Sequence, residues 1–301
     1  MKRALLALIM LPLVLLYQGH AFAKEPQGVR KATLAGSWYP ANPESLSRLI
    51  GGYLSNAGVE KPAGELKAII VPHAGYPYSG QVAAYAYRLL EKSPFKRIVL
   101  IGPSHRVPFR GVSVNLQSGY ETPLGLVPVD CAAAEKIIAM SDHIRWIPQA
   151  HAKEHSLEIQ IPFLQTVLQD FEIVPILMGQ QDIETCRILA RSLLKVLGDS
   201  EGTLLLASTD LSHFHSYDEA RNLDMEFIRH VRAFDPAALA RAIATGSCEA
   251  CGAGPTVTTM LAAQNVGADR SAILHYANSG DVTGDHHQVV GYVSAALLKS
   301  K

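Results

Sequence analysis

The sequence predicts an α/β fold, organised as a single layered domain with a largely parallel or mixed central sheet flanked by helices. Two observations lead to this prediction. Short apolar runs rich in β-branched residues, typical of buried strands, alternate along the chain with segments whose apolar residues recur at helical spacing. In addition, no Pro/Gly/Ser-rich linker and no internal repeat interrupts this alternation. We therefore expect one domain, near the upper end of the usual single-domain size.

The predicted strands are apolar runs bounded by turn residues. The run 67–71, for example, contains two isoleucines and a valine and is followed directly by Pro72 and His73. The runs 111–116 and 124–129 are expected to be linked through Gly119 and Pro123. In chain order, the predicted strands are 67–71, 97–101, 111–116, 124–129, 171–178, 203–207, 271–277 and 289–298.

The predicted helices have apolar residues three or four positions apart and start at residues that suit a helix N-terminus. Asn42 and Pro43 suit the first helix, and Asp130 is expected to cap another. Pro162 lies within the predicted helix 150–169 and predicts either a kink or a later helix start. In chain order, the predicted helices are 44–54, 81–91, 130–140, 150–169, 184–197, 217–231, 236–244 and 255–264.

The N-terminal residues are expected to lie outside this fold. A basic start, Met1–Arg3, precedes the uncharged apolar run 4–17 and a small-residue pattern that ends at Ala23. Together these features predict a secretory signal peptide over 1–23, cut after Ala23, and a mature domain over 24–301. The alternative is an uncleaved anchor, but the apolar run is shorter than the roughly 20 residues of a spanning helix. The mature protein is therefore expected to be exported, into the periplasm of a Gram-negative cell, without an integral membrane segment.

The charge balance excludes partners that are bound through bulk charge. The chain has 27 basic and 27 acidic residues, and 48% of its residues are hydrophobic. A nucleic-acid binder needs a basic footprint, so we expect no nucleic-acid partner. The 4 cysteines are too few for a disulfide scaffold in 301 residues, so a hydrophobic core is expected to hold the fold.

Candidate functional residues follow three of the predicted strands. His73 follows 67–71, His105 follows 97–101, and both Asp210 and His213 follow 203–207. In a parallel sheet the carboxyl ends of the strands lie along one edge, where ligands bind. We therefore expect these four side chains to converge, although each taken alone is equally compatible with a turn, a cap or a surface position.

Cys251 is a further candidate, because it precedes the predicted helix that begins near Pro255. A thiol at a helix N-terminus is favoured as the thiolate, which is the form that binds metals. Two imidazoles and a thiolate, with or without a carboxylate, suit iron, copper or zinc better than calcium or magnesium. The competing interpretation is a disulfide or a redox dithiol between Cys248 and Cys251, which would remove this ligand.

Three polar residues at the start of the helix 150–169 have an open role. Glu154, His155 and Glu158 are compatible with a solvated helix face that has a capping role. His155 and Glu158 lie three positions apart, on one side of the helix, and either is equally suited to orient a ligand or carry a proton. Cys131 and Cys186 fall at helical positions and are predicted to be small core residues.

Taken together, the motifs resemble those of the Memo family, also called component B of the AmmeMemoRadiSam system. They occur in the order typical of that family and span nearly the whole mature chain. The matching segments are 36–40 (GSWYP), 72–76 (PHAGY), 102–105 (GPSH), 122–125 (TPLG), 154–158 (EHSLE), 208–213 (STDLSH), 251–252 (CG) and 279–281 (SGD).

The resemblance implies a fold similar to that of the class III, extradiol-type non-haem iron dioxygenases. Carried onto this chain, it implies that His73, His105 and Cys251 are metal ligands, with a cysteine where the dioxygenases have a carboxylate. The implied activity is oxidoreductase or dioxygenase-like chemistry at one iron or copper ion, with zinc less suited, acting on dioxygen or an unidentified small molecule.

The resemblance also implies roles for the residues around that ion. His155 is expected to face the cleft, and Asp210 and His213 to lie beside the ligands, where the three would transfer protons or orient a bound species. Partner proteins of the AmmeMemoRadiSam system are implied too, although export would separate this chain from a cytosolic radical-SAM protein.

Two other functions stay open at this point. One is a non-enzymatic module of the cell envelope that stores, senses or delivers the metal or binds another ligand. The other is a zinc hydrolase with Asp210 or Glu158 as general base, which is disfavoured because the chain has no H-E-x-x-H pattern.

Overall fold

The computed structural model of the protein describes residues 27–198 and 202–301. The predicted signal peptide, 1–23, lies outside the described residues and stays a prediction. Within the part of the chain that is described, no helix is both long enough and apolar enough to cross a membrane.

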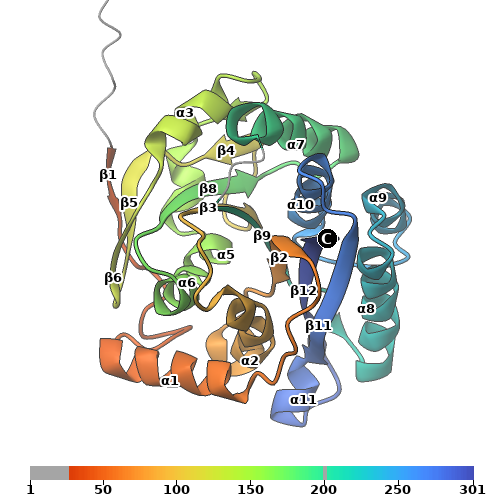
Figure 1. Ribbon diagram of the computed structural model, residues 1–301. Helices are drawn as coiled ribbons and strands as arrows, with labels where there is room; N and C mark the ends of the chain where they lie inside the picture. The colour runs from red at the N-terminus through yellow and green to blue at the C-terminus, as the bar shows by residue number, and fades with distance from the viewer. Residues whose placement is uncertain (1–26, 199–201) are drawn as a thin grey trace, which may run out of the picture.

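A mixed sheet forms the centre of the molecule (Figure 1). In the described part of the chain it has nine strands, of which β2, β9, β3 and β8 are parallel to one another. The flanking strands β12 and β4 run antiparallel to β2 and β8, which confirms the predicted α/β class with a mixed sheet. The strand order is β10 (His213–His215), β12 (Val289–Lys299), β2 (Glu65–Val71), β9 (Thr203–Ser208), β3 (Arg97–Pro103), β8 (Glu172–Met178), β4 (Val112–Val114) and β7 (Ile144–Arg145), with β11 (Arg270–Asn278) paired to β12.

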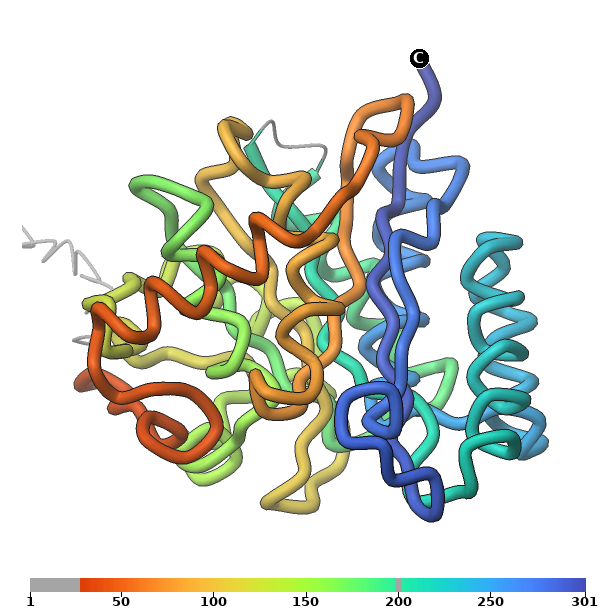
Figure 2. Tube along the Cα trace, turned by 90° about the horizontal axis from the view of Figure 1, so that it is seen from below, coloured from red at the N-terminus to blue at the C-terminus, as the bar shows by residue number. Residues whose placement is uncertain are grey.

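Helices cover both faces of this sheet, because its central strands are apolar on both sides. In β2, Ala68 and Ile70 belong to one hydrophobic core, whereas Ile69 and Val71 belong to the other. The first core is covered by α3 (Cys131–Ile138), α7 (Ile183–Leu197), α8 (Tyr217–Arg232), α9 (Pro236–Ala244) and α10 (Ala253–Asn265). The second is covered by α1 (Pro43–Asn56), α2 (Tyr76–Tyr87), η1 (Arg88–Leu90), α4 (Pro148–Ala152), α5 (His155–Glu158) and α6 (Ile161–Val167). Figure 2 shows α8 beside the hairpin of β11 and β12, which it contacts.

A separate small sheet contains an element that the sequence did not predict. It consists of β1 (Gln27–Arg30), β5 (Gln117–Thr122) and β6 (Gly125–Pro128). β5 and β6 form a tight antiparallel pair, so Gly119 lies inside a strand rather than in a link between strands. A Cβ at position 119 would lie 2.8 Å from the carbonyl oxygen of Val127, so glycine is needed for this close approach.

The predicted continuous helix 150–169 is wrong, because the chain forms α4, α5 and α6 in its place. α5 begins anew after Glu154, whose carboxylate accepts the N–H groups of His155 and Ser156. α6 begins at Ile161 with Pro162 in its first turn, as the late-start interpretation of that proline predicted. The break matters for function because it turns the start of α5 toward the sheet edge, next to the end of β3.

Candidate metal centre

Three histidines meet at the edge where the parallel strands end. His73 comes two residues after β2, His105 two residues after β3, and His155 is the first residue of α5. Each offers a nitrogen atom, and these three atoms all lie within 4.8 Å of one another. The His105 and His155 rings stack with their centroids 4.3 Å apart, and the His73 ring is edge-on to both. The cluster is therefore compact enough for one metal ion, with His155 contributing to it as closely as the two predicted ligands.

Glu154 holds two of these histidines, a role that the sequence did not reveal. Its carboxylate accepts the backbone N–H of His105 at 2.6 Å and the Nδ1–H of His105 at 2.9 Å. It also accepts the backbone N–H groups of His155 and Ser156, each at 3.0 Å. Burial opposes ionisation, but the hydrogen bonds and the neighbouring imidazoles outweigh it and bring the pKa of Glu154 down to about 2. Glu154 is thus a carboxylate that directs Nε2 of His105 away from itself.

Cys251 reaches the same cluster from the other side of the sheet. Its Sγ lies 3.1 Å from Nε2 of His73, immediately before the N-cap residue Gly252 of α10. Cys251 and Cys248 are both free thiols, so the alternative disulfide does not form. Burial, together with the nearby carboxylate of Asp210, raises the pKa of the Cys251 thiol, in the direction opposite to the predicted helix N-terminus effect. The ligand role of Cys251 stays a prediction, and binding a metal would require loss of this proton.

Asp210 and His213 lie beside the cluster, in the places that the strand-end argument predicted. Asp210 accepts the backbone N–H of His73 at 2.7 Å, and its other oxygen is 3.9 Å from Nε2 of His73. Burial raises the pKa of Asp210 to about 7 even though backbone N–H groups of His73 and Ala74 stabilise the carboxylate. Burial lowers the pKa of His213. Near neutral pH, Asp210 is therefore able both to release and to accept a proton.

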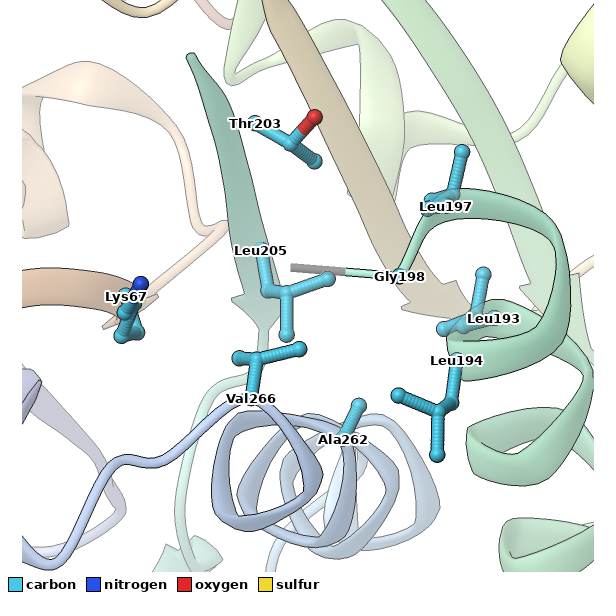
Figure 3. A pocket seen from close by; sticks show the side chains of 9 residues that line it. All are labelled: Lys67, Leu193, Leu194, Leu197, Gly198, Thr203, Leu205, Ala262 and Val266. Atoms are coloured by element: carbon cyan, nitrogen blue, oxygen red, sulfur yellow. The ribbon is translucent and has the colours of Figure 1, made fainter. Parts of the chain in front are cut away.

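The three histidines, Asp210 and His213 line one open pocket of about 670 Å³, a volume typical of small-molecule sites, whereas Cys251 and Glu154 are not part of its lining. Trp38, Tyr78 and Tyr292 supply aromatic walls, and the Trp38 ring lies 4.7 Å from that of His155. The full lining is Ser37, Trp38, His73, Ala74, Gly75, Pro77, Tyr78, His105, His155, Asp210, His213, Val290 and Tyr292. A second cavity, bounded by α7, α10 and the start of β9, is shown in Figure 3. With about 30 Å³ it has room for little more than a water molecule.

The residues of the pocket fit a transition-metal ion. Burial and the neighbouring imidazoles lower the pKa of His73 well below its usual range, and burial lowers that of His155 to about 4. Both rings are then neutral at pH 7, the form of imidazole that binds metals. In addition, Nδ1 of His155 is buried and meets no hydrogen-bond partner among the described residues, although it lies 3.2 Å from the carboxylate oxygen Oε1 of Glu154.

Glu158 does not line this pocket, so it is not positioned to orient a ligand or carry a proton there. It is completely buried and accepts from Arg30 at 2.6 Å and from the hydroxyl of Tyr39 at 2.7 Å. The structure therefore excludes the solvated helix face as the position of Glu158. Arg30 also donates to the backbone oxygens of His151 and Glu154, so this ion pair fastens β1 to the segment that carries His155.

Comparisons with known proteins cover nearly the whole described chain. The family model described as "Memo-like protein" matches residues 30–296. A MEMO1 family protein of Methanopyrus kandleri is 34% identical over 287 residues, covering 90% of this chain and 99% of the relative. A MEMO1 family protein of Methanobrevibacter smithii is 37% identical over 278 residues, covering 88% of this chain and 98% of the relative. An uncharacterized protein from Escherichia coli K12 is a structural neighbour with a TM-score of 0.49 and 14% sequence identity. The match covers 77% of this chain and 99% of the neighbour.

Proposed function

The chain belongs to the Memo family, and from this premise we propose that it is a redox protein that uses one iron or copper ion. The ion would be held by His73, His105 and Cys251, with His155 completing or closing the site. The observation that carries the proposal is the convergence of three imidazole nitrogens within 4.8 Å, beside a thiol 3.1 Å from His73. Nitrogen and sulfur donors in this combination favour iron, copper or zinc over calcium and magnesium.

A bound iron or copper ion would supply electron transfer and dioxygen chemistry. The protein's own residues prepare the surroundings. Trp38 and Tyr292 line the same pocket as Asp210, whose pKa of about 7 suits proton exchange with a substrate bound there.

Metal analysis tests the ligand assignment. We expect protein purified from the cell envelope without added metal to hold about one ion per chain, and the His73→Ala/His105→Ala variant to hold none. His143 and His287 are exposed histidines outside the pocket, so the His143→Ala/His287→Ala variant is the matched control. Equal, sub-stoichiometric metal in all three proteins would contradict the proposal.

Turnover separates an enzyme from a storage or delivery protein. We expect the metal-loaded protein to consume oxygen in the presence of a reductant or a catechol, and the His73→Ala/His105→Ala variant not to. Stoichiometric metal with no consumption above that of the variant would favour the non-enzymatic function.

Export is a further part of the proposal. It is supported by the basic start, the apolar run and the small residues before Lys24. Mass spectrometry of the protein from the periplasmic fraction should identify Lys24 as the first residue. An intact N-terminus in the cytosolic fraction would instead leave partners of the AmmeMemoRadiSam system within reach.

A further inference from the structure

We propose that Ser208 and Gln160 are positioning residues that hold His73 in the tautomer with its proton on Nδ1, leaving Nε2 free toward the pocket. Neither residue lines the pocket, and both side chains are buried, at 0% and 1% exposure. The inference rests on the proposed function, because it concerns how one metal ligand is prepared. It follows from the directions of the hydrogen bonds behind the His73 ring.

Ser208, the last residue of β9, has three polar neighbours around its hydroxyl. Its Oγ lies 2.6 Å from the carbonyl oxygen of Ser156, 2.8 Å from Nε2 of Gln160 and 2.9 Å from Nδ1 of His73. A carbonyl oxygen can only accept, so the single hydroxyl proton goes to Ser156. The oxygen is then left with lone pairs only, and Nδ1 of His73 must be the donor.

Gln160 excludes the opposite arrangement. Its Nε2 lies 2.9 Å from the carbonyl oxygen of Pro72, which again can only accept, and its Oε1 accepts the hydroxyl of Tyr87 at 2.7 Å. This fixes the side-chain amide with its NH₂ group toward Ser208. Because burial raises the pKa of Tyr87, that hydroxyl remains a donor. The hydrogen bonds therefore run in one direction, from Tyr87 through Gln160 to Ser208 and on to Ser156.

As a consequence, the His73 ring is in its metal-binding tautomer before any metal ion binds. With the proton on Nδ1, the lone pair of His73 is on Nε2, the nitrogen that lies 3.1 Å from Sγ of Cys251. In the metal-free protein the thiol donates to this lone pair. The hydrogen bonds from Tyr87 to Ser156 need no bridging water, because the groups bond to one another directly. Tyr87, Ser156 and Ser208 are also completely buried. A ring held in its binding tautomer loses less freedom when it binds a metal.

The tautomer can be measured directly in the metal-free protein. In ¹⁵N-labelled protein, long-range correlations between ring protons and ring nitrogens identify which nitrogen of His73 is protonated, with the His73→Ala variant providing the assignment. We expect a protonated Nδ1 and a bare Nε2. A proton on Nε2, or an even mixture of the two tautomers, would overturn the inference. Since no metal is present, this result is independent of whether the proposed function is right.

Two variants test the two residues themselves, and a third serves as their control. Ser208→Ala should give a mixture of His73 tautomers and weaken copper(II) binding by about tenfold or more, as for other partners of metal-binding histidines. Gln160→Met should weaken it by about two- to fivefold, because Ser208 still donates to Ser156. Ser294→Ala is the matched control, since Ser294 is an equally buried strand serine whose hydroxyl has no hydrogen-bond partner among the described residues.

The pattern across these variants decides the inference. If Ser208→Ala binds copper(II) and shows the His73 tautomer just as Ser294→Ala does, Ser208 and Gln160 have only a packing role. Should Ser208→Ala fail to fold, the wild-type spectrum and Gln160→Met still decide it, because a wild-type Nε2–H tautomer contradicts these hydrogen-bond directions outright.

Discussion

His73 and His105 are adjacent in one pocket, yet opposite kinds of partner hold them from behind. The Nδ1–H of His105 donates to the carboxylate of Glu154, whereas that of His73 donates to the neutral hydroxyl of Ser208. Position explains the difference. The side chain of His105 is 27% exposed and that of His73 only 1%. His73 already contacts the carboxylate of Asp210, so a second anion behind it would be repelled in a region of low dielectric.

The comparison shows two ways to orient a metal ligand. A carboxylate orients the ring and also increases its basicity, but the charge must be stabilised, here by N–H groups at the start of α5. A hydroxyl adds no charge, and it needs further hydrogen bonds, from Gln160 and to Ser156, to fix which way it points. The first arrangement should therefore be the more sensitive to mutation and to pH.

The largest effect is expected from Glu154→Gln. The variant keeps the shape of the side chain but removes the charge that holds His105, so copper(II) or iron(II) affinity should fall by about 100-fold. The loss of charged hydrogen bonds should also lower the free energy of unfolding by about 1–3 kcal/mol. Calorimetric titration and urea unfolding measure the two quantities. Glu184→Gln, in an exposed pair with Arg191, is the control and should change neither. A Glu154→Gln affinity no lower than that of Ser208→Ala would contradict the comparison.

A smaller effect is expected from pH. Because the pKa of Glu154 is lowered from 4.5 to about 2, its contribution to stability is complete above about pH 4.5 and is lost as the pH falls toward 2. Urea unfolding of the metal-free protein at pH 6 and at pH 4 should therefore show a decrease that is smaller in Glu154→Gln, by up to about 1 kcal/mol. Ser208→Ala should lose as much stability as wild type, because no charge is removed. Equal losses in all three proteins would show that Glu154 is not the titrating group.

The smallest effect on the metal is expected from Ser208→Thr. The substitution keeps the hydroxyl, so affinity should stay within about threefold of wild type, with His73 still protonated on Nδ1. The additional methyl group in a fully buried strand should cost about 1 kcal/mol or more of stability. Tenfold weaker binding with an unchanged tautomer would mean that packing at position 208, rather than its hydroxyl, supports the site.

The sequence predicted the parts of the site that depend on local order. His73, His105 and Asp210 each follow an apolar run, and parallel strands bring such positions to one edge. The same argument located His213, which the structure places in the pocket lining. Whether Cys251 binds the metal, as the family resemblance implies, stays a prediction.

The supporting residues could not be predicted in this way. Glu154 and His105 are 49 positions apart in the chain, and Ser208 and His73 are 135 apart. The sequence left a capping role open for Glu154, which the structure bears out, but its contact with His105 depends on the tertiary fold. No local pattern indicates that Glu158 turns inward to meet Arg30, which is 128 positions away.

By itself, the sequence determined the layered α/β class and the edge at which the polar side chains gather, because both follow from short-range apolar periodicity. Only the tertiary structure decided that a nitrogen of His155 lies as close to the cluster as those of His73 and His105, that Glu154 and Glu158 have separate roles, and which nitrogen of His73 and of His105 is free. Those features depend on hydrogen-bond partners from distant segments. In a buried hydrogen-bond network each donor must find an acceptor, and the packed fold determines which one is within reach.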